Sequence, residues 1–134
     1  MRTPAEILRS ASTIAVVGAS PDPDRPSHRV MRYLLASGYD AIPVRPAGCH
    51  EILGVPCVRS LAEVDRPIDI VDVFRRAEFT PEVAQAAADA GARALWLQLG
   101  IVSPESREIA EAAGLDYVED LCTAVVHARE VKEG

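Results

Sequence analysis

Five arginines stand in three short segments of a chain that is acidic as a whole. Arg25 and Arg29 fall in and just after a proline-rich stretch, Arg45 is followed by a proline, and Arg75 and Arg76 are adjacent. The chain holds 20 Asp and Glu against 14 Lys and Arg, and its net charge is -6. Guanidinium groups bind phosphate through paired hydrogen bonds, so the grouped arginines indicate an anion site. Ion pairs with neighbouring acids would explain any single one equally well.

A second candidate for phosphate contact is the segment Gly18-Ala19-Ser20, which follows an apolar, β-branched run. Gly18 lets a ligand approach the backbone, and a helix starting at Ser27 would point free N–H groups and its positive dipole end into the same space. The segment lacks the second and third glycines of the dinucleotide motif G-x-G-x-x-G. A glycine that merely ends a buried strand explains Gly18 equally well.

The residue after the second predicted strand bears on which nucleotide would bind. Dinucleotide enzymes carry an acidic residue there, which holds the ribose hydroxyls of NAD. This chain has Arg45 instead, followed by the rigid Pro46. Because an arginine suits a ribose that carries a phosphate, we expect NADP or coenzyme A rather than NAD.

Few side chains are placed to do catalytic chemistry. His28 is the one histidine in a predicted site loop, and no carboxylate stands near it in sequence to orient it. Asp69 and Asp72 are three apart on a predicted strand, so they point to opposite faces and do not form an acid/base pair. Cys122 precedes a predicted helix whose dipole would favour a thiolate and exchange with a ligand thiol; a buried structural cysteine is the competing interpretation. We therefore expect no catalytic residue and a binding module rather than an enzyme.

The composition argues against several other classes of protein. Nucleic-acid binders usually carry a basic stripe, whereas the net charge here is -6. No apolar run is long enough to cross a bilayer, and residues 1–12 do not show a secretory pattern. The cysteines Cys49, Cys57 and Cys122 are odd in number and lack metal-binding spacing. We expect a cytoplasmic protein with reduced thiols, no bound metal, and neither nucleic acid nor membrane as a partner.

The elements that must position these residues alternate between strand and helix. Apolar runs predict strands at 13–18, 39–44, 68–74, 94–99 and 115–118, and capping, proline and glycine signals predict helices at 27–38, 80–91, 103–114 and 123–131. Short connections between alternating elements predict right-handed crossovers and a mostly parallel sheet of about five strands. The predicted fold class is therefore α/β, a three-layer doubly wound Rossmann-like domain that takes up residues 1–134. Such sheets bind ligands beyond the carboxyl ends of their strands, which is where the candidate residues fall.

Six short motifs follow one another along the chain. They are Gly18-Ala19-Ser20, Asp24-Arg25-Pro26-Ser27, Ile42-Pro43-Val44-x-Pro46, Glu51-x-Leu53-Gly54, Val71-Asp72-Val73-Phe74-Arg75 and Trp96-Leu97-Gln98-Leu99-Gly100. Together they closely resemble the stand-alone CoA-binding domain family, from about Thr13 to Cys122. The resemblance implies a Rossmann-like fold similar to the CoA-binding domain of the succinyl-CoA synthetase alpha subunit.

The resemblance also assigns residues to a coenzyme A site. It implies phosphate contacts from the loop and helix start at Gly18, Ala19, Ser20, Arg25, Pro26 and Ser27, adenosine contacts from Val44 and Pro46 on either side of Arg45, and a groove completed by Phe74, Arg75, Gln98 and Gly100. Two departures from the family pattern stand out. Arg45 replaces an expected asparagine, and the usual Met-x-Arg-Cys reads Glu119-Asp120-Leu121-Cys122. An additional basic group at Arg45 and a missing one at Leu121 would shift the phosphates of the ligand.

The function hypothesis is thus a non-catalytic module that binds coenzyme A or an acyl-CoA. The related synthetase needs a phosphorylated histidine in a second domain, for which 134 residues leave no room, so a ligase activity is not implied. Two alternatives stay open: an NADP-linked oxidoreductase, and a CoA-sensing regulatory subunit of a partner enzyme. Both a monomer and a homodimer are compatible with a domain of this size.

Overall fold

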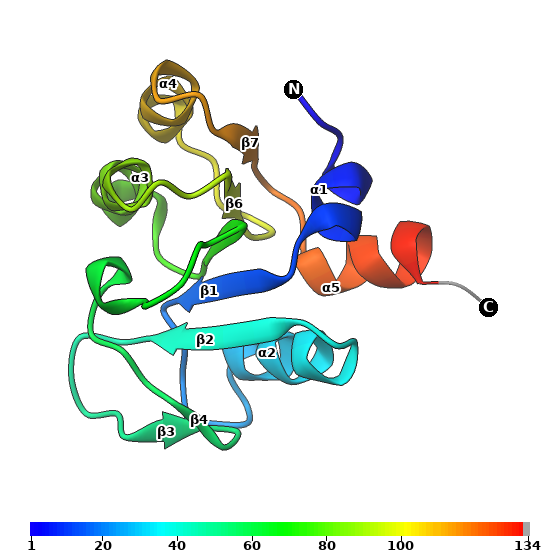
Figure 1. The fold of residues 1–134 in the computed structure, drawn as a ribbon, viewed down its shortest axis with the longest axis vertical. Coiled ribbons are helices and arrows are strands. Elements are labelled where there is room, and N and C mark those ends of the chain that lie inside the picture. The colour runs from blue at the N-terminus through cyan, green and yellow to red at the C-terminus, as the bar shows by residue number, and fades with distance from the viewer. Residues whose placement is uncertain (133–134) are drawn as a thin grey trace.

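A five-stranded parallel sheet forms the centre of the protein (Figure 1), in a computed structural model that describes residues 1–132. Its strands are β1 (Thr13–Val17), β2 (Asp40–Val44), β5 (Ile70–Val73), β6 (Ala94–Leu97) and β7 (Asp116–Val118), in the spatial order β2-β1-β5-β6-β7. All neighbouring strands pair in parallel. The chain goes from β1 outward to β2 and then returns to the other side of β1, so the strand order reverses between β1 and β5. The predicted α/β, doubly wound class is confirmed.

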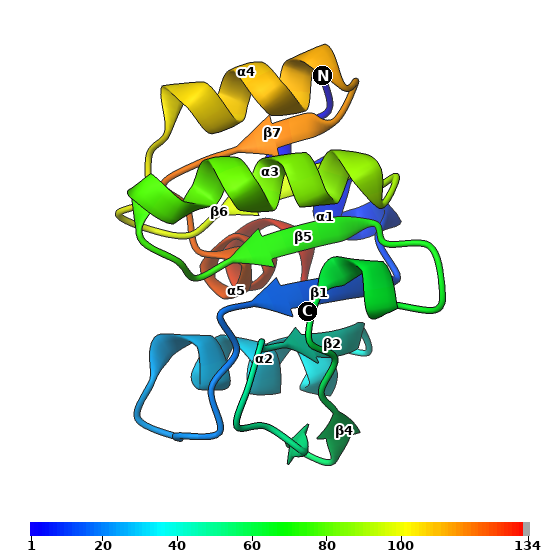
Figure 2. The same cartoon turned by 90° about the vertical axis from the view of Figure 1, so that its left-hand side faces the viewer.

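Helices cover both faces of the sheet (Figure 2). On one face lie α1 (Pro4–Ser10), α2 (Pro26–Ala36) and α5 (Thr123–Val126), and on the other lie α3 (Thr80–Asp89) and α4 (Pro104–Ala112). Every residue of β1, β5 and β6 is buried, which is why these strands appear in the sequence as continuous apolar runs without alternation. Among the described residues, no helix is long and apolar enough to cross a membrane.

Two helices are capped differently from the sequence-based prediction. The helix α2 begins at Pro26 with Arg25 at the N-cap, and Ser27 lies inside the first turn, so Ser27 is not the cap. The helix α3 begins at Thr80, whose hydroxyl donates to the carbonyl of Ala77 2.7 Å away and does not cap the helix. In both cases a first-turn proline, with its fixed φ, starts the helix without a side-chain cap. The predicted start at Ser103 is confirmed, because its side chain accepts from the Ser106 N–H.

The segment between β2 and β5 contains a short antiparallel hairpin that the sequence did not predict. It consists of β3 (Glu51–Ile52) and β4 (Val55–Pro56). Its turn residues Leu53 and Gly54 both have positive φ, 52° and 79°. This is the backbone geometry that a tight hairpin turn requires.

The hairpin also overturns the expectation of three reduced thiols. Cys49 and Cys57 flank it with their Cα atoms 6.0 Å apart, and the two residues form a disulfide. The hairpin brings two cysteines that are eight positions apart in sequence, one before β3 and one after β4, to a separation that a disulfide can span. Cys122 is the free cysteine.

The placement of α2 against the sheet leads to a test of the packing. Leu34 on α2 is fully buried in the core cluster that also holds Met31 and Trp96, whereas Leu99 is 71% exposed. We expect Leu34→Ala to lower the free energy of unfolding by about 2–5 kcal/mol and Leu99→Ala by less than about 0.5 kcal/mol, measured by urea denaturation. Equal losses for the two variants would contradict this packing.

Candidate functional site

A groove of about 1070 Å³ lies beyond the carboxyl ends of β1, β5 and β6. The loops that follow these strands and the first turn of α2 form its walls, and Cys122, just before α5, reaches it as well. A second hollow of about 570 Å³ extends from it between the ends of β1 and β2 and the helix α3. The two share Gly18, Arg45 and Arg75, so they adjoin at the point where the strand order reverses.

The structure brings together all the residues that the sequence assigned to the ligand. The larger groove is lined by Gly18, Ser20, Arg25, Pro26, Ser27, Arg45, Phe74, Arg75, Gln98 and Gly100. The remaining three, Ala19, Val44 and Pro46, line the second hollow. Their roles toward a ligand remain predictions, but their proximity is a feature of the fold.

Gly18 occupies the point of closest approach between the loops after β1 and β5. Its φ is +86°, and a Cβ atom there would lie 2.5 Å from the carbonyl oxygen of Phe74. The Phe74 N–H in turn donates to the Val17 carbonyl over 2.8 Å. Packing alone therefore requires a glycine at position 18, and the same lack of a side chain leaves the backbone open to the groove.

The N-terminus of α2 faces the groove without a side-chain cap. Its N-cap residue Arg25 and the first-turn residues Pro26 and Ser27 all line the groove. Pro26 has no N–H, and the N–H groups of His28 and Arg29 donate to the Arg25 carbonyl, so the Ser27 N–H and the positive end of the helix dipole are what favour an anion at this position. On the same helix, His28 is buried, and its Nδ1 lies 2.9 Å from the Ser20 carbonyl. His28 thus supports the loop after β1.

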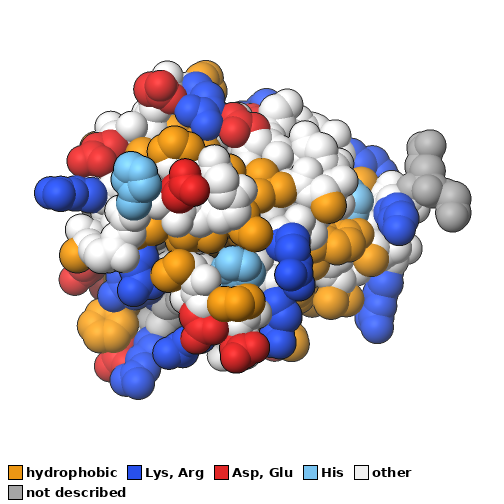
Figure 3. Space-filling model, turned by 90° about the horizontal axis from the view of Figure 1, so that it is seen from below, with side chains coloured by type: hydrophobic (Ala, Val, Ile, Leu, Met, Phe, Trp, Pro, Cys, Tyr) orange, Lys and Arg blue, Asp and Glu red, His pale blue; other side chains and the backbone are white. Residues whose placement is uncertain are grey.

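Four arginines, Arg25, Arg45, Arg75 and Arg76, line the larger groove, against one acidic residue, Asp22. Among residues 1–132 none of the four forms an ion pair. Ion pairing with neighbouring acids therefore does not explain them. On the face shown in Figure 3, Lys and Arg side chains lie among acidic and hydrophobic ones, so the positive charge is not spread as a stripe over that face.

Two of these arginines are held in place by their surroundings. Arg45 donates from Nη1 to the carbonyl of Ala19 and from Nε to that of Ala47, both over 3.1 Å. The guanidinium of Arg75 lies 5.0 Å from the ring centroid of Phe79. Backbone contacts fix Arg45 between the two hollows, so its side chain bridges the ends of β1 and β2.

A buried polar network lies beneath the uncharged end of the groove. Asp72 on β5 is fully buried, and its Oδ1 and Oδ2 accept hydrogen bonds from Gln98 Nε2 over 2.5 Å and from Thr123 Oγ1 over 2.9 Å. Gln98 Nε2 also donates to Thr123 Oγ1 over 2.9 Å. Burial raises the pKa of Asp72 to about 7, although both hydrogen bonds act to lower it. The sequence singled out Gln98 but did not predict its link to Asp72 and Thr123.

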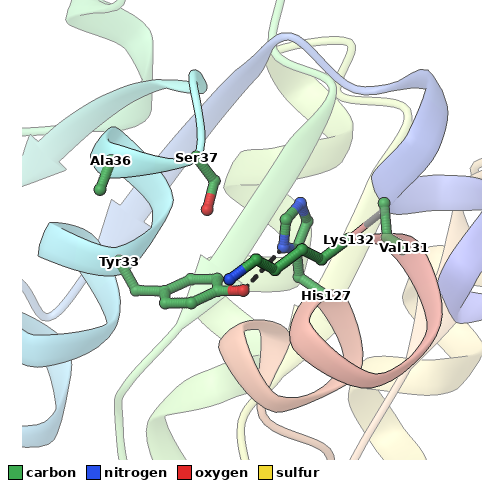
Figure 4. Close-up of a pocket in the computed structure, with 6 residues that line it drawn as sticks. All are labelled: Tyr33, Ala36, Ser37, His127, Val131 and Lys132. Atoms are coloured by element: carbon green, nitrogen blue, oxygen red, sulfur yellow. Dashed lines mark hydrogen bonds between the residues drawn. The ribbon is translucent and has the colours of Figure 1, made fainter. Parts of the chain in front are cut away.

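A separate hollow of about 420 Å³ lies between the C-terminal end of α2 and the π-helical turn His127–Val131 that continues α5 (Figure 4). Within it the Tyr33 hydroxyl lies 2.9 Å from His127 Nδ1. Burial lowers the pKa of His127, which favours the neutral imidazole. None of the residues predicted for the ligand lines this hollow.

The chain and its fold are similar to several known proteins. Residues 12–128 match the model of a family described as a CoA binding domain. The chain belongs to this family. It is 46% identical over 123 residues to the uncharacterized protein YneT of Bacillus subtilis. The aligned region covers 92% of this chain and 90% of YneT.

Solved structures of the same shape extend the comparison. A hypothetical protein from Pyrococcus horikoshii superimposes with a TM-score of 0.92 at 37% identity, over 96% of this chain and 90% of that one. The dinucleotide-forming acetyl-coenzyme A synthetase 1 of Ca. Korarchaeum cryptofilum has a TM-score of 0.74 at 24% identity, over 84% of this chain and 26% of that one. This second likeness shows a shared fold.

Two glycines with the same φ allow a test of the contact at the strand ends. Gly100 has φ +85° with open space at its Cβ position, whereas Gly18 has φ +86° and abuts Phe74. Both alanine variants carry the backbone strain, but only Gly18→Ala adds a clash. We expect Gly18→Ala to cost about 1–3 kcal/mol more than Gly100→Ala in urea denaturation. An equal loss of stability in the two variants would show that the loop after β1 is not in contact with the loop after β5.

The buried carboxyl predicts how stability depends on pH. The pKa of Asp72 lies near 7 in the folded protein and near the free value of about 3.9 in the unfolded chain. Between about pH 4 and about pH 7 the carboxyl is therefore protonated in the folded state but ionised in the unfolded state. This contribution to stability therefore falls as pH rises from about 4 to about 7 and is constant above. We expect Asp72→Asn to remove that slope and to be more stable than the unmodified protein at pH 8 by on the order of 2 kcal/mol. Urea denaturation midpoints measured from pH 4 to pH 8 give the pH dependence of stability. The same slope in Asp72→Asn as in the unmodified protein would contradict the buried carboxyl, and Asp69→Asn is the control variant.

Proposed function

We propose that the protein binds coenzyme A, or an acyl-CoA, in the groove at the strand ends. The observation that carries the proposal is the order of the side chains along two adjoining hollows: arginines follow β2 and β5 and start α2, which is the cationic part, whereas uncharged side chains follow β6 and precede α5, which is the uncharged part. Arg25, Arg45 and Arg75 belong to the cationic part, and Gln98 and Cys122 to the uncharged one. Coenzyme A is divided in the same way, with a phosphorylated nucleotide at one end and a neutral arm that ends in a thiol at the other.

The cationic part suits the phosphates and the adenosine. The Ser27 N–H at the start of α2 and the arginines offer N–H donors and positive charge to phosphate oxygens. The adjoining hollow adds the apolar side chains of Val44, Pro46, Leu61 and Val83, which suit the faces of an adenine ring. Arg45 lies between these two regions, where a phosphate on the ribose would meet it.

The uncharged part suits the arm and its thiol or acyl group. Leu99, Ile101 and Cys122 line it together with Gln98 and Gly100. A neutral arm loses less hydration free energy than a phosphate on entering such surroundings, where the phosphate would have no compensating charge. The groove therefore favours one orientation of the ligand.

Binding without catalysis is part of the proposal. His28 Nδ1 is engaged by the Ser20 carbonyl, and Asp72 is fully enclosed in its network. A general base must reach the proton that it removes from a reacting group. Neither side chain is placed to do so.

Two further candidates each rest on one observation. Arg45 at the end of β2 would also meet the 2′-phosphate of NADP, which supports an NADP-linked oxidoreductase. Exposed apolar side chains at the uncharged end, Leu99, Leu121 and Val125, would support a regulatory subunit that docks onto an enzyme when the groove is filled. Coenzyme A remains the preferred ligand because uncharged side chains after β6 and before α5 line the groove beside the arginines.

Titration calorimetry with four ligands tests these proposals. Under reducing conditions we expect saturable binding of CoA, weaker binding of dephospho-CoA, and binding of NADP that is weaker than that of CoA. NADP binding tighter than CoA binding would favour the oxidoreductase. A lack of binding by CoA, dephospho-CoA and 3′,5′-ADP would overturn the proposal of a CoA site.

Removing the charge of Arg45 tests the orientation of the nucleotide. We expect Arg45→Gln to weaken CoA about tenfold and dephospho-CoA by less than about twofold, because only CoA carries the ribose 3′-phosphate. Arg29→Gln is the matched control, since Arg29 is exposed on α2 and lines neither hollow. An equal loss for both ligands would refute this role for Arg45.

A further inference from the structure

Gln98 connects the buried network to the groove. It follows β6 at the point where the strand opens into the site, and it is only 5% exposed although it lines the groove. Its backbone is fixed as well, since its N–H donates to Val73 and its carbonyl accepts from Ile101. Its side chain can therefore offer only one atom to a ligand, and the network decides which one.

The network takes up both hydrogens of the Gln98 amide. Nε2 donates to Asp72 Oδ1 over 2.5 Å and to Thr123 Oγ1 over 2.9 Å, and the Thr123 hydroxyl donates to Asp72 Oδ2 over 2.9 Å. An ionised carboxyl only accepts hydrogen bonds. A reversed amide would place Oε1 against that carboxylate and lose the donor, which is costly in a buried site.

The amide oxygen is consequently the atom that faces the groove. In the described part of the chain, every buried side-chain nitrogen or oxygen has a hydrogen-bond partner. Oε1 of Gln98 has no partner there, so it is not enclosed. The groove thus presents a fixed hydrogen-bond acceptor in its uncharged part.

We infer that Gln98 selects ligands whose neutral arm donates a hydrogen bond, such as the amide N–H of a peptide-like arm. This inference rests on the proposed function and adds the hydrogen-bonding polarity of the arm site. Asp72 and Thr123 act as positioning residues, because they hold the Gln98 amide in one orientation and do not reach the ligand themselves. The arm of coenzyme A carries two such secondary amides.

The first test compares ligands with and without the arm at pH 8, where the Asp72 carboxyl is ionised. Gln98→Met keeps the length of the side chain but removes the acceptor. We expect this variant to bind CoA and dephospho-CoA about three- to tenfold more weakly and to leave 3′,5′-ADP, which lacks the arm, unchanged. Gln85→Met on the exposed side of α3 is the matched control.

Each contrary outcome has a distinct meaning. The inference would be overturned if Gln98→Met bound CoA with unchanged affinity, or if it lost affinity for 3′,5′-ADP as much as for CoA. CoA binding by the unmodified protein would still support the proposed function in both cases. A lack of binding by all three ligands to the unmodified protein would instead overturn the proposed function.

A charge swap tests the positioning role of Asp72. Gln98→Glu places two carboxylates against each other, so we expect it to lower stability and CoA affinity. In the double variant with Asp72→Asn, the amide at position 72 donates to the carboxylate at position 98, which is the reverse of the original hydrogen bond. The second oxygen of that carboxylate still faces the groove. Recovery of CoA affinity in the double variant relative to Gln98→Glu supports the inference. Recovery of stability without recovery of CoA affinity would contradict it.

Discussion

The close contact between Gly18 and Phe74 is the constraint that shapes the site. The strands β1 and β5 are neighbours, yet the chain leaves β1 toward α2 on one face and β5 toward α3 on the other. Their loops start within van der Waals contact, which requires a glycine at position 18, and then diverge. The groove opens where they part, with the start of α2 on one side and Arg75 on the other. The ligand site is therefore a consequence of strand order, as in other doubly wound sheets.

The buried network beneath this opening lowers stability and orders the site. An ionised Asp72 without a charged partner is unfavourable in the core, which is why its pKa is raised to about 7. Its two hydrogen-bond partners come from the residue after β6 and from the first residue of α5. The carboxyl thereby ties three elements together at the uncharged end of the groove and fixes the orientation of the one amide that reaches it. A hydrophobic residue at this position would leave the Gln98 amide without its acceptor and with its orientation undefined.

Sequence patterns predicted the sheet and the site loops because both follow from local rules. Continuous apolar runs indicate strands buried on both faces, and the strand-end rule brought Arg25, Arg45 and Arg75 to one place. The helix α1 was missed although Thr3 and Glu6 form a capping box that announces it. The hairpin was missed because Leu53 takes a positive φ that its type does not suggest. The partners of Asp72 lie 26 and 51 positions away and are tertiary contacts without a local signal; an aspartate flanked by valines inside the predicted strand was the only hint.

A crystal structure of the protein with bound coenzyme A would show directly how the ligand lies in the groove. We expect the nucleotide to lie against the start of α2 and Arg45, and an amide of the arm to donate to Oε1 of Gln98. Coenzyme A bound in the reverse direction, or in the hollow between Tyr33 and His127, would contradict both the proposed site and its polarity.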